Sequence, residues 1–206
     1  MAKYIRIYPD NPHPVRIDEA AEILQNGGLL IYPTDTVYGL GASLQHPKAI
    51  EKLALIKGVK PQSAPFTLLF HNLSQMSEFI KPVDTPTFKI LKKATPGPYT
   101  FILPATRRLP KIFQKRKTIG FRIPDNPVLL EILRRLNHPV INISIKDEDE
   151  IIEYTTDPEL IYEKWRNRVD AVVDGGILEK TPSTVVDLTG EEPVVVREGK
   201  GPVDIF

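Results

Sequence analysis

The sequence lacks several residue types and patterns that would mark particular classes of protein. It contains no cysteine, which excludes disulfide bonds, thiolate catalysis and cysteine-based zinc sites. Its four histidines show no metal-ligand spacing, so we expect no metal site built by the protein. No apolar run approaches the roughly 20 residues that a membrane-spanning helix needs. Residues 1–6 alternate and carry charge, unlike a signal peptide, and we therefore expect a cytoplasmic protein without a membrane partner.

The sequence also lacks an excess of charge of either sign. It has 27 Lys and Arg against 26 Asp and Glu, which gives a formal net charge of +1. This balance argues against a protein that is basic over its whole surface, but it allows a local basic patch. With 206 residues, 41% of them hydrophobic, and no repeat or low-complexity linker, the chain predicts a single domain over residues 1–206.

Short apolar segments alternate with amphipathic segments along the chain. The first kind predicts strands, and the helical spacing of apolar residues in the second predicts helices. The predicted strands are 4–8, 29–32, 66–70, 99–103, 118–123, 140–143, 169–173, 184–188 and 194–197. The predicted helices begin near residues 17, 47, 84, 126 and 157. Because several strands follow one another without a helix between them, the pattern indicates an α/β fold with a mixed, twisted sheet.

The segment 33–41 is predicted to be a loop that follows the buried strand 29–32. It carries hydroxyl groups, a carboxylate and a phenol in Thr34, Asp35 and Tyr38, but no G-x-G-x-x-G motif, because residue 44 is leucine. Ligands of open α/β sheets bind beyond the carboxyl ends of strands, so these side chains can face a cleft. The same residue types are favoured in an ordinary hydrogen-bonded turn, and the sequence leaves both interpretations open.

One arginine, Arg122, stands inside an apolar strand, directly before Ile123 and Pro124. A buried charge without a partner is costly, so we expect Arg122 to have one. The planar guanidinium suits a carboxylate or a phosphate, which makes this residue a candidate ligand-binding group.

A run of basic residues precedes the same strand. From residue 105 to residue 123 the sequence has no acidic residue. A basic strip beside a cleft suits phosphates or an RNA backbone, whereas a solvated surface loop is the simpler interpretation of its lysines. The candidate RNA-binding residues are Arg107, Arg108, Lys111, Lys115, Arg116 and Lys117.

Small polar and basic residues also lie at the ends of other predicted strands. Ser144 and Lys146 follow the strand 140–143, Ser183 precedes the strand 184–188, and Arg197 ends the last strand. Such groups can contact a ribose or a phosphate, although an ordinary strand-to-loop exit is equally compatible with them.

Together these stretches resemble the YrdC-like family. The matching motifs are PTDTVYGL at 33–40, PGPYT at 96–100, FRIPDNP at 121–127 and STVVD at 183–187. They occur in the family's order and cover nearly the whole chain. The segments 7–12, 115–120 and 194–199 are most similar to the YciO-type branch. The resemblance implies a twisted, open, mixed α/β sheet with flanking helices and a positively charged concave face.

The resemblance also implies a chemistry. The better-known branch forms threonylcarbamoyl-adenylate from L-threonine, bicarbonate and ATP, for the threonylcarbamoyl modification of tRNA. The amine attacks bicarbonate and the carbamate attacks the α-phosphate, so no protein nucleophile is needed. Mg²⁺ is expected to accompany ATP, held mainly by the phosphates and water. Binding of tRNA or double-stranded RNA on the concave face has also been attributed to the family.

Carried over position by position, the resemblance implies roles for individual residues. Thr34 and Arg122 bind threonine, with Arg122 on its carboxylate, while Tyr38 and Thr100 shape the pocket wall. The implied nucleotide and phosphate residues are Lys57, Lys60, Ser144, Lys146, Ser183 and Arg197.

The chain differs from the synthase branch in two of these motifs. The synthases have Lys-x-Arg before a proline, where this chain has Gly58, Val59 and Lys60 before Pro61. They also have Ser-x-Asn where this chain has Lys146 in place of the asparagine. Three functions therefore stay open: a threonylcarbamoyl-adenylate synthase with full or reduced activity, a paralogue that binds nucleotide and RNA without that reaction, and an enzyme that hydrolyses or transfers a related carbamoyl- or acyl-adenylate.

Overall fold

The computed structural model describes residues 1–113, 115–145 and 153–206. Within these residues, ten strands form a single sheet in the order β1-β8-β2-β3-β7-β4-β6-β5-β9-β10. The strands are β1 (Lys3–Arg6), β2 (Leu29–Tyr32), β3 (Gly39–Ser43), β4 (Thr67–Leu69), β5 (Tyr99–Pro104), β6 (Thr118–Arg122), β7 (Val140–Ser144), β8 (Ala171–Asp174), β9 (Thr184–Asp187) and β10 (Val194–Arg197). The helices are α1 (Pro14–Gln25), α2 (Pro47–Ile56), α3 (Leu73–Ser77), α4 (Thr85–Ala94), the 3₁₀ helix η1 (Lys111–Phe113), α5 (Pro127–Leu136), α6 (Glu153–Thr156) and α7 (Pro158–Trp165).

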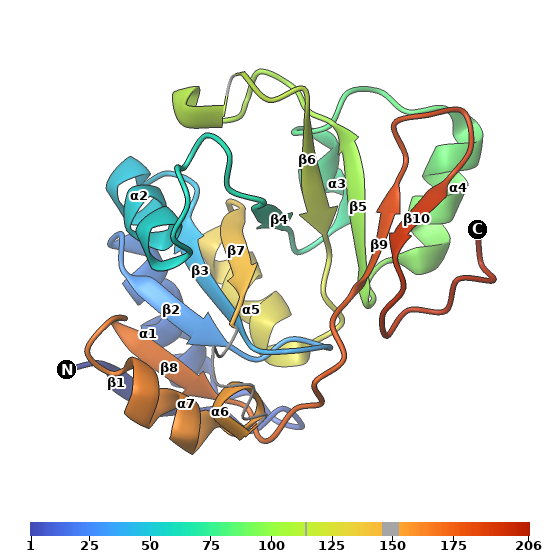
Figure 1. Ribbon diagram of the computed structural model, residues 1–206. Helices are drawn as coiled ribbons and strands as arrows, with labels where there is room; N and C mark the ends of the chain where they lie inside the picture. The colour runs from blue at the N-terminus through green and yellow to red at the C-terminus, as the bar shows by residue number, and fades with distance from the viewer. Residues whose placement is uncertain (114, 146–152) are drawn as a thin grey trace.

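The sheet is mixed, as the sequence predicts. Parallel pairs join β1 to β8, β2 to β8, β4 to β6 and β5 to β9, and the remaining neighbours are antiparallel. The strand directions turn markedly between the β1–β8–β2 end and the β5–β9–β10 end (Figure 1). The predicted α/β fold with a twisted, open sheet is therefore confirmed.

Three helices begin after an aspartate or asparagine at the N-cap position, which is followed by a proline or a threonine. The side chains of Asp84, Asn126 and Asp157 accept hydrogen bonds from the backbone N–H groups of Thr87, Leu129 and Glu159, respectively. These bonds satisfy donors that have no partner inside the helix, so each cap fixes where its helix starts. The cap at Asn126 places α5 directly after β6, the strand that carries Arg122.

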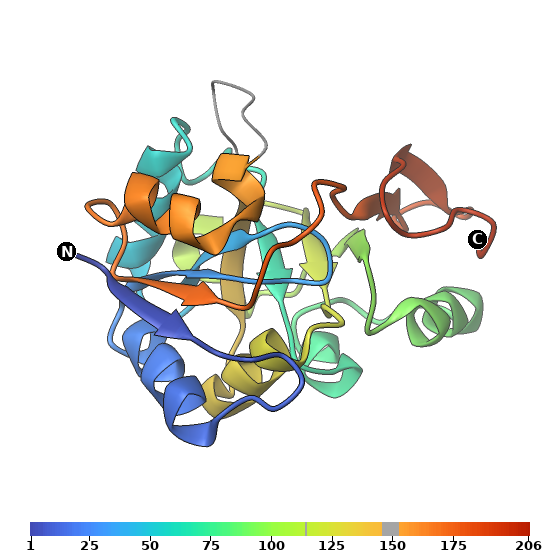
Figure 2. The same ribbon diagram turned by 90° about the horizontal axis from the view of Figure 1, so that it is seen from below.

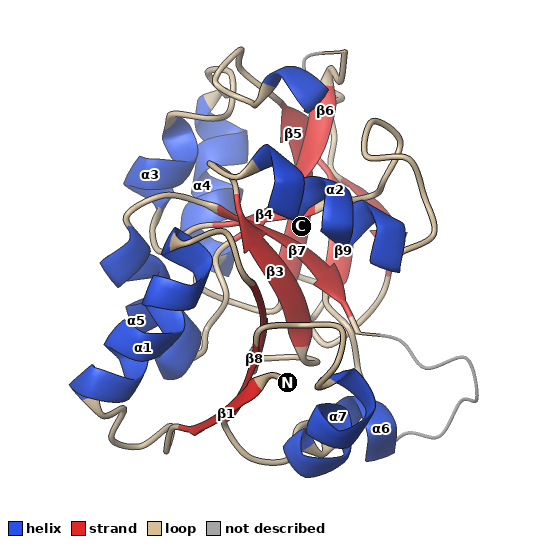
Figure 3. Cartoon of the chain, turned by 90° about the vertical axis from the view of Figure 1, so that its left-hand side faces the viewer, coloured by secondary structure: helices blue, strands red, loops and turns tan. Residues whose placement is uncertain are grey.

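Residues of each central strand alternate between two hydrophobic cores. In β2, Leu29 and Ile31 join the core beneath α2, α3, α4 and α7, whereas Leu30 and Tyr32 join the core beneath α1 and α5. Figure 2 shows α1 and α5 on the opposite side of β1 and β8 from α6 and α7. Figure 3 shows α1 and α5 together on one flank of the molecule. The second core leaves part of its sheet face uncovered, and the candidate site lies there.

One strand contradicts the predicted loop at 33–41. β3 begins at Gly39 and pairs antiparallel with both β2 and β7. A Cβ atom at Gly39 would collide with Asn142 and the Tyr32 ring, and one at Gly41 would collide with the Tyr32 hydroxyl. Both glycines are thus required for Tyr32 to lie across β3, although glycine in a sequence usually indicates a turn.

No helix in the described part of the chain is long and apolar enough to cross a membrane.

Candidate functional site

A cleft of about 420 Å³ lies on the sheet face that α1 and α5 leave uncovered. On β5, Thr100 and Ile102 line the cleft, while Phe101 and Leu103 point into the core on the other side. On β6, Gly120 is part of the lining, and its missing side chain keeps the floor open between Thr67 and Thr100. The alternation of strand residues therefore places the polar side chains of these strands on the cleft face, while their neighbours along the chain enter the apolar core.

The charged residues that line the cleft are of one sign. They are Lys57, Arg116, Arg122 and Arg197, and among the residues that the structure describes no Asp or Glu lines it. Hydroxyl and amide groups complete the polar lining, from Thr67, Thr100, Thr118, Asn142, Ser144 and Ser183. Cationic and hydroxyl groups without competing carboxylates suit a ligand that carries phosphate or carboxylate groups.

Arg122 is buried, with 5% of its surface exposed, and its partner comes from the loop after β2. Its Nη2 donates to Asp35 Oδ1 at 2.5 Å and to Thr36 Oγ1 at 2.9 Å. The expected partner of Arg122 is thus a carboxylate 87 positions earlier in the chain. Nε of Arg122 and Oδ2 of Asp35 are buried without a hydrogen-bond partner. A donor left unmet on a side chain that lines a cleft favours a ligand oxygen as its partner.

Thr34 does not line this cleft and is 3% exposed. Its hydroxyl donates to the carbonyl of Val37 at 2.7 Å and accepts from the N–H of Thr36 at 2.9 Å. It also lies 3.0 Å from the Thr36 hydroxyl, which in turn contacts Arg122. The structure thus connects Thr34 to the cleft through Thr36 and Arg122.

A second cluster joins β5 to the C-terminal hairpin. The hydroxyls of Thr100 and Ser183 lie 2.9 Å apart, and Arg197 donates from Nη2 to the Ser183 carbonyl at 2.7 Å. Burial lowers the pKa of Arg197, and the positive charge of Arg122 lowers it further. The two guanidinium groups therefore repel each other across the cleft, and an anion between them would relieve that repulsion.

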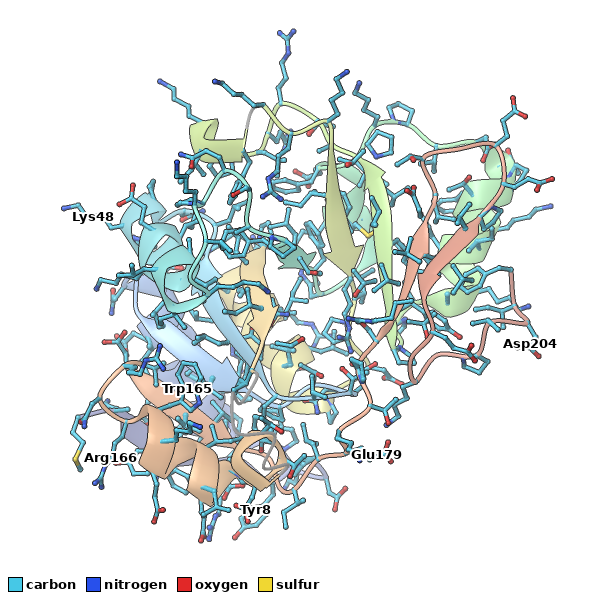
Figure 4. All side chains as sticks on the ribbon, viewed as in Figure 1. Tyr8, Lys48, Trp165, Arg166, Glu179 and Asp204 are labelled. Carbon is cyan, nitrogen blue, oxygen red and sulfur yellow. The ribbon has the colours of Figure 1, made fainter. Side chains whose placement is uncertain are left out.

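The two lysines after α2 lie on different sides of their loop. Lys57 lines the cleft, whereas Lys60 lines a separate hollow with Leu55, Val59 and Lys48. Figure 4 labels Lys48 on the outer side of α2, away from the sheet. Lys60 thus does not line the cleft that contains Arg122, and its phosphate-binding role stays a prediction.

Two further predicted residues lie outside the cleft or outside the described residues. Tyr38 is fully buried, and its hydroxyl donates to the Gly176 carbonyl at 2.7 Å, so it does not form part of the cleft lining. Burial raises the pKa of Tyr38 well above its usual value. Tyr38 thereby anchors the loop after β8, and its predicted role in the pocket wall stays a prediction. Lys146 lies outside the residues that the structure describes.

Among the described residues of the basic segment 107–117, Arg116 is the one that lines the cleft. Arg116 lines the cleft and also an adjacent hollow that includes Arg107 and Lys117. The Arg116 guanidinium donates to the backbone carbonyls of Gln62 and Ala64, and burial lowers its pKa. Side chains that end in nitrogen project outward from the connection between β5 and β6 (Figure 4).

The other members of this segment are placed away from the cleft. Arg108 forms an ion pair with Glu78 and is exposed, and Lys111 and Lys115 are exposed and line neither hollow. Arg107, Arg116 and Lys117 thus line the cleft or the adjacent hollow, whereas Arg108, Lys111 and Lys115 line neither, and the RNA-binding role of all six stays a prediction.

Thr67 and Gly120 line the cleft although the sequence did not single them out. Asp35 and Thr36 lie in the candidate loop 33–41, and Asn142 begins the candidate stretch that ends at Lys146. Thr67 and Gly120 are ordinary strand residues whose position becomes visible only when β4 and β6 are placed side by side.

The donor set of the cleft bears on the Mg²⁺ expected with ATP. Among the described residues, no group of three histidine or carboxylate side chains could hold a metal ion. The lining offers hydroxyl, amide and cationic groups, which do not bind Mg²⁺ on their own. These residues thus do not fit a Mg²⁺ ion held directly by the protein.

Comparisons with known proteins give consistent results. The model of a family described as "Telomere recombination", which covers Sua5, YciO and YrdC, matches residues 22–199. The chain is 40% identical to YciO of Escherichia coli over the full length of both proteins, and the crystal structure of E. coli YciO superposes with a TM-score of 0.91. It is also 42% identical to a protein of Haemophilus influenzae, covering 98% of this chain and 97% of that protein.

A more distant relative has a stated activity. The chain is 28% identical to a threonylcarbamoyl-AMP synthase of Pyrococcus abyssi, over 92% of this chain but only 55% of that longer protein. The crystal structure of P. abyssi Sua5 complexed with L-threonine superposes with a TM-score of 0.85 at 25% identity, covering 99% of this chain and 59% of that one.

Proposed function

Because the chain belongs to the Sua5, YciO and YrdC family, we propose that its cleft forms threonylcarbamoyl-adenylate from L-threonine, bicarbonate and ATP. The product would supply the threonylcarbamoyl group for tRNA modification. The observation that carries this proposal is the cleft itself, in which four cations and several hydroxyls face one another without a described acidic residue. The threonine carboxylate, bicarbonate and the ATP phosphates are all anionic groups, which the charge of this lining suits.

In the proposed reaction, Arg122 binds the carboxylate of threonine. The threonine amine attacks the carbon of bicarbonate, a C–N bond forms, and water leaves to give the carbamate. A carbamate oxygen then attacks the α-phosphorus of ATP, the α–β phosphoanhydride bond breaks, and pyrophosphate leaves. Arg122 supports both steps by fixing the amino acid, since correct placement alone can remove a large part of the barrier.

The nucleotide would lie along the other wall of the cleft. Ser144, Ser183 and Thr100 provide hydroxyls there, and Arg197 provides a charge held in place by the Ser183 carbonyl. Arg197 and Lys57 would stabilise the negative charge that develops on the departing pyrophosphate. When bound, Mg²⁺ would neutralise part of the triphosphate charge.

Product formation tests this proposal directly. We expect isotope-labelled threonine, incubated with bicarbonate, ATP and the protein, to give labelled threonylcarbamoyl-adenylate by mass spectrometry. Omission of bicarbonate should abolish the product. Arg197→Ala should reduce it at least about tenfold through loss of a preorganised cation. Arg134→Ala, on the exposed face of α5, is the matched control and should leave it unchanged. Absence of the product under all conditions would refute the proposal.

A second candidate function is favoured by the basic segment. Arg116 and Thr118 line both the cleft and the adjacent hollow with Arg107 and Lys117. A polyanion longer than ATP could therefore contact both, as expected of a paralogue that binds nucleotide and tRNA or double-stranded RNA without the synthase reaction. Salt-dependent RNA binding by a protein that yields no adenylate would favour this second function.

A further inference from the structure

The contacts of Thr34 and Thr36 fix the direction of a chain of hydrogen bonds. The Thr34 hydroxyl has one proton, which it donates to the Val37 carbonyl at 2.7 Å. The 3.0 Å contact between the two threonine hydroxyls must therefore be donated by Thr36. The Thr36 oxygen then accepts from Nη2 of Arg122 at 2.9 Å. The chain runs in one direction, from Arg122 through Thr36 and Thr34 to the backbone.

This direction leaves the Thr34 hydroxyl with no capacity for a ligand. A hydroxyl donates one hydrogen bond and accepts two. Thr34 donates to Val37 and accepts from both the N–H and the hydroxyl of Thr36. In addition, Thr34 is 3% exposed and is not part of the cleft lining.

Arg122 needs such a chain because its ion pair alone holds it loosely. Asp35 and Arg122 share a single hydrogen bond, and the second oxygen of Asp35 and Nε of Arg122 are left buried without partners. An arginine side chain has several rotatable bonds, so one contact does not determine the plane of its guanidinium. Thr36 adds a second acceptor on the same nitrogen and removes this freedom.

We propose that Thr34 acts on the substrate through Arg122: Thr34 and Thr36 are positioning residues that orient the guanidinium. This inference rests on the proposed function, in which Arg122 binds the threonine carboxylate. It assigns the hydroxyl of Thr34 a different role from that of a direct substrate ligand.

A double-mutant cycle separates the two roles. Thr34→Val removes the hydroxyl, and Arg122→Lys keeps the charge but loses the oriented fork. We expect Thr34→Val to weaken threonine binding about fivefold in the wild-type background, as for the loss of one neutral hydrogen bond. In the Arg122→Lys background, Thr34→Val should weaken threonine binding less than about twofold, because that background has no guanidinium for Thr34 to orient. An equal loss in both backgrounds would mean that Thr34 contacts threonine directly, and would overturn the proposal.

Three further variants complete the cycle. Thr36→Val should resemble Thr34→Val, and Thr34→Ser should restore binding because it keeps the hydroxyl. Thr95→Val is the matched control, since the Thr95 hydroxyl also donates to a backbone carbonyl at 2.7 Å but lies outside the cleft lining. The effect should appear in KM for threonine more than in kcat at saturating threonine.

A ligand-free measurement keeps the inference independent of the synthase reaction. In ¹⁵N-labelled protein, the Nη2 protons of Arg122 should give hydrogen-bonded, slowly rotating signals that Arg122→Lys removes. Thr34→Val and Thr36→Val should shift the signal of the Nη2 proton that faces Thr36, while the proton bonded to Asp35 keeps its signal, and Thr34→Ser and Thr95→Val should leave both signals in place. Absence of the signals from the wild type, or an unshifted signal of the Thr36-facing proton in Thr34→Val, would overturn the proposal. If the wild type fails to bind threonine but this pattern holds, the proposed function fails and the positioning role stands.

Discussion

The cleft and the segment 107–117 are both rich in basic residues, but their side chains are held in opposite ways. In the cleft, Arg122 is buried against Asp35 and Thr36, and Arg197 is fixed by the Ser183 carbonyl. In the segment, Arg107 and Lys117 are exposed. Arg116 belongs to both regions and is fixed by backbone carbonyls.

The number of basic residues in a region is therefore a poor guide to a small-molecule site. A charged side chain that is already ordered and partly desolvated loses little conformational entropy when a ligand binds. An exposed lysine loses more, because the ligand must order it. The cleft is therefore suited to a small, oriented ligand. The segment is suited to a polyanion that binds through many weak, salt-sensitive contacts.

The largest expected effect comes from neutralising the buried arginine. Arg122→Gln leaves the Asp35 carboxylate buried without its cation, so we expect a loss of about 3 kcal/mol in the free energy of unfolding. Urea denaturation measures this loss. The double variant Arg122→Gln with Asp35→Asn should regain most of the stability but bind no threonine, as calorimetry would show. Wild-type threonine affinity in either variant would contradict the role of Arg122.

A smaller effect is expected from the two lysines after α2. Lys57→Ala should weaken binding of ATP about tenfold, because a charge that lines the cleft is lost. Lys60→Ala is the matched variant on the same loop and should change affinity less than about twofold, since Lys60 lines the hollow outside α2. Equilibrium binding of a fluorescent ATP analogue distinguishes them, and the reverse order of effects would place Lys60 in the site.

Charge reversal in the basic segment should have the smallest effect on small ligands. Lys115→Glu with Lys117→Glu should leave threonine and ATP affinity within about twofold, because both side chains are exposed and neither lines the cleft. For structured RNA, the slope of log affinity against log salt should fall by about one per lost phosphate contact. Lys92→Glu with Lys93→Glu on α4 is the control. An unchanged RNA salt slope would remove the segment from the RNA-binding proposal.

Much of the fold could be predicted from local patterns in the sequence. Alternation and apolar runs located nine strands, and capping residues such as Asp84 and Asn126 located helix starts. β3 was missed because its glycines serve the packing of Tyr32, a contact between strands that local sequence does not reveal. The strand order likewise depends on long-range pairing, as between β5 and β9.

The site was only partly predictable, for a related reason. Arg122 stood out because a charge inside an apolar strand requires a partner, and the structure supplies one. That the partner is Asp35 depends on the order of β2, β3, β7, β4 and β6 in the sheet, which brings the loop after β2 to the end of β6. The opposite placements of Lys57 and Lys60 depend on the path of one loop, which residue types alone do not determine.

A crystal structure of this chain with L-threonine and a non-hydrolysable ATP analogue would show where both ligands bind relative to Arg122, Arg197 and Lys57. We predict that the threonine carboxylate accepts a hydrogen bond from Arg122, while the phosphates lie between Arg197 and Lys57 within the cleft. Threonine bound elsewhere, or phosphates bound only along the exposed segment 107–117, would contradict the account.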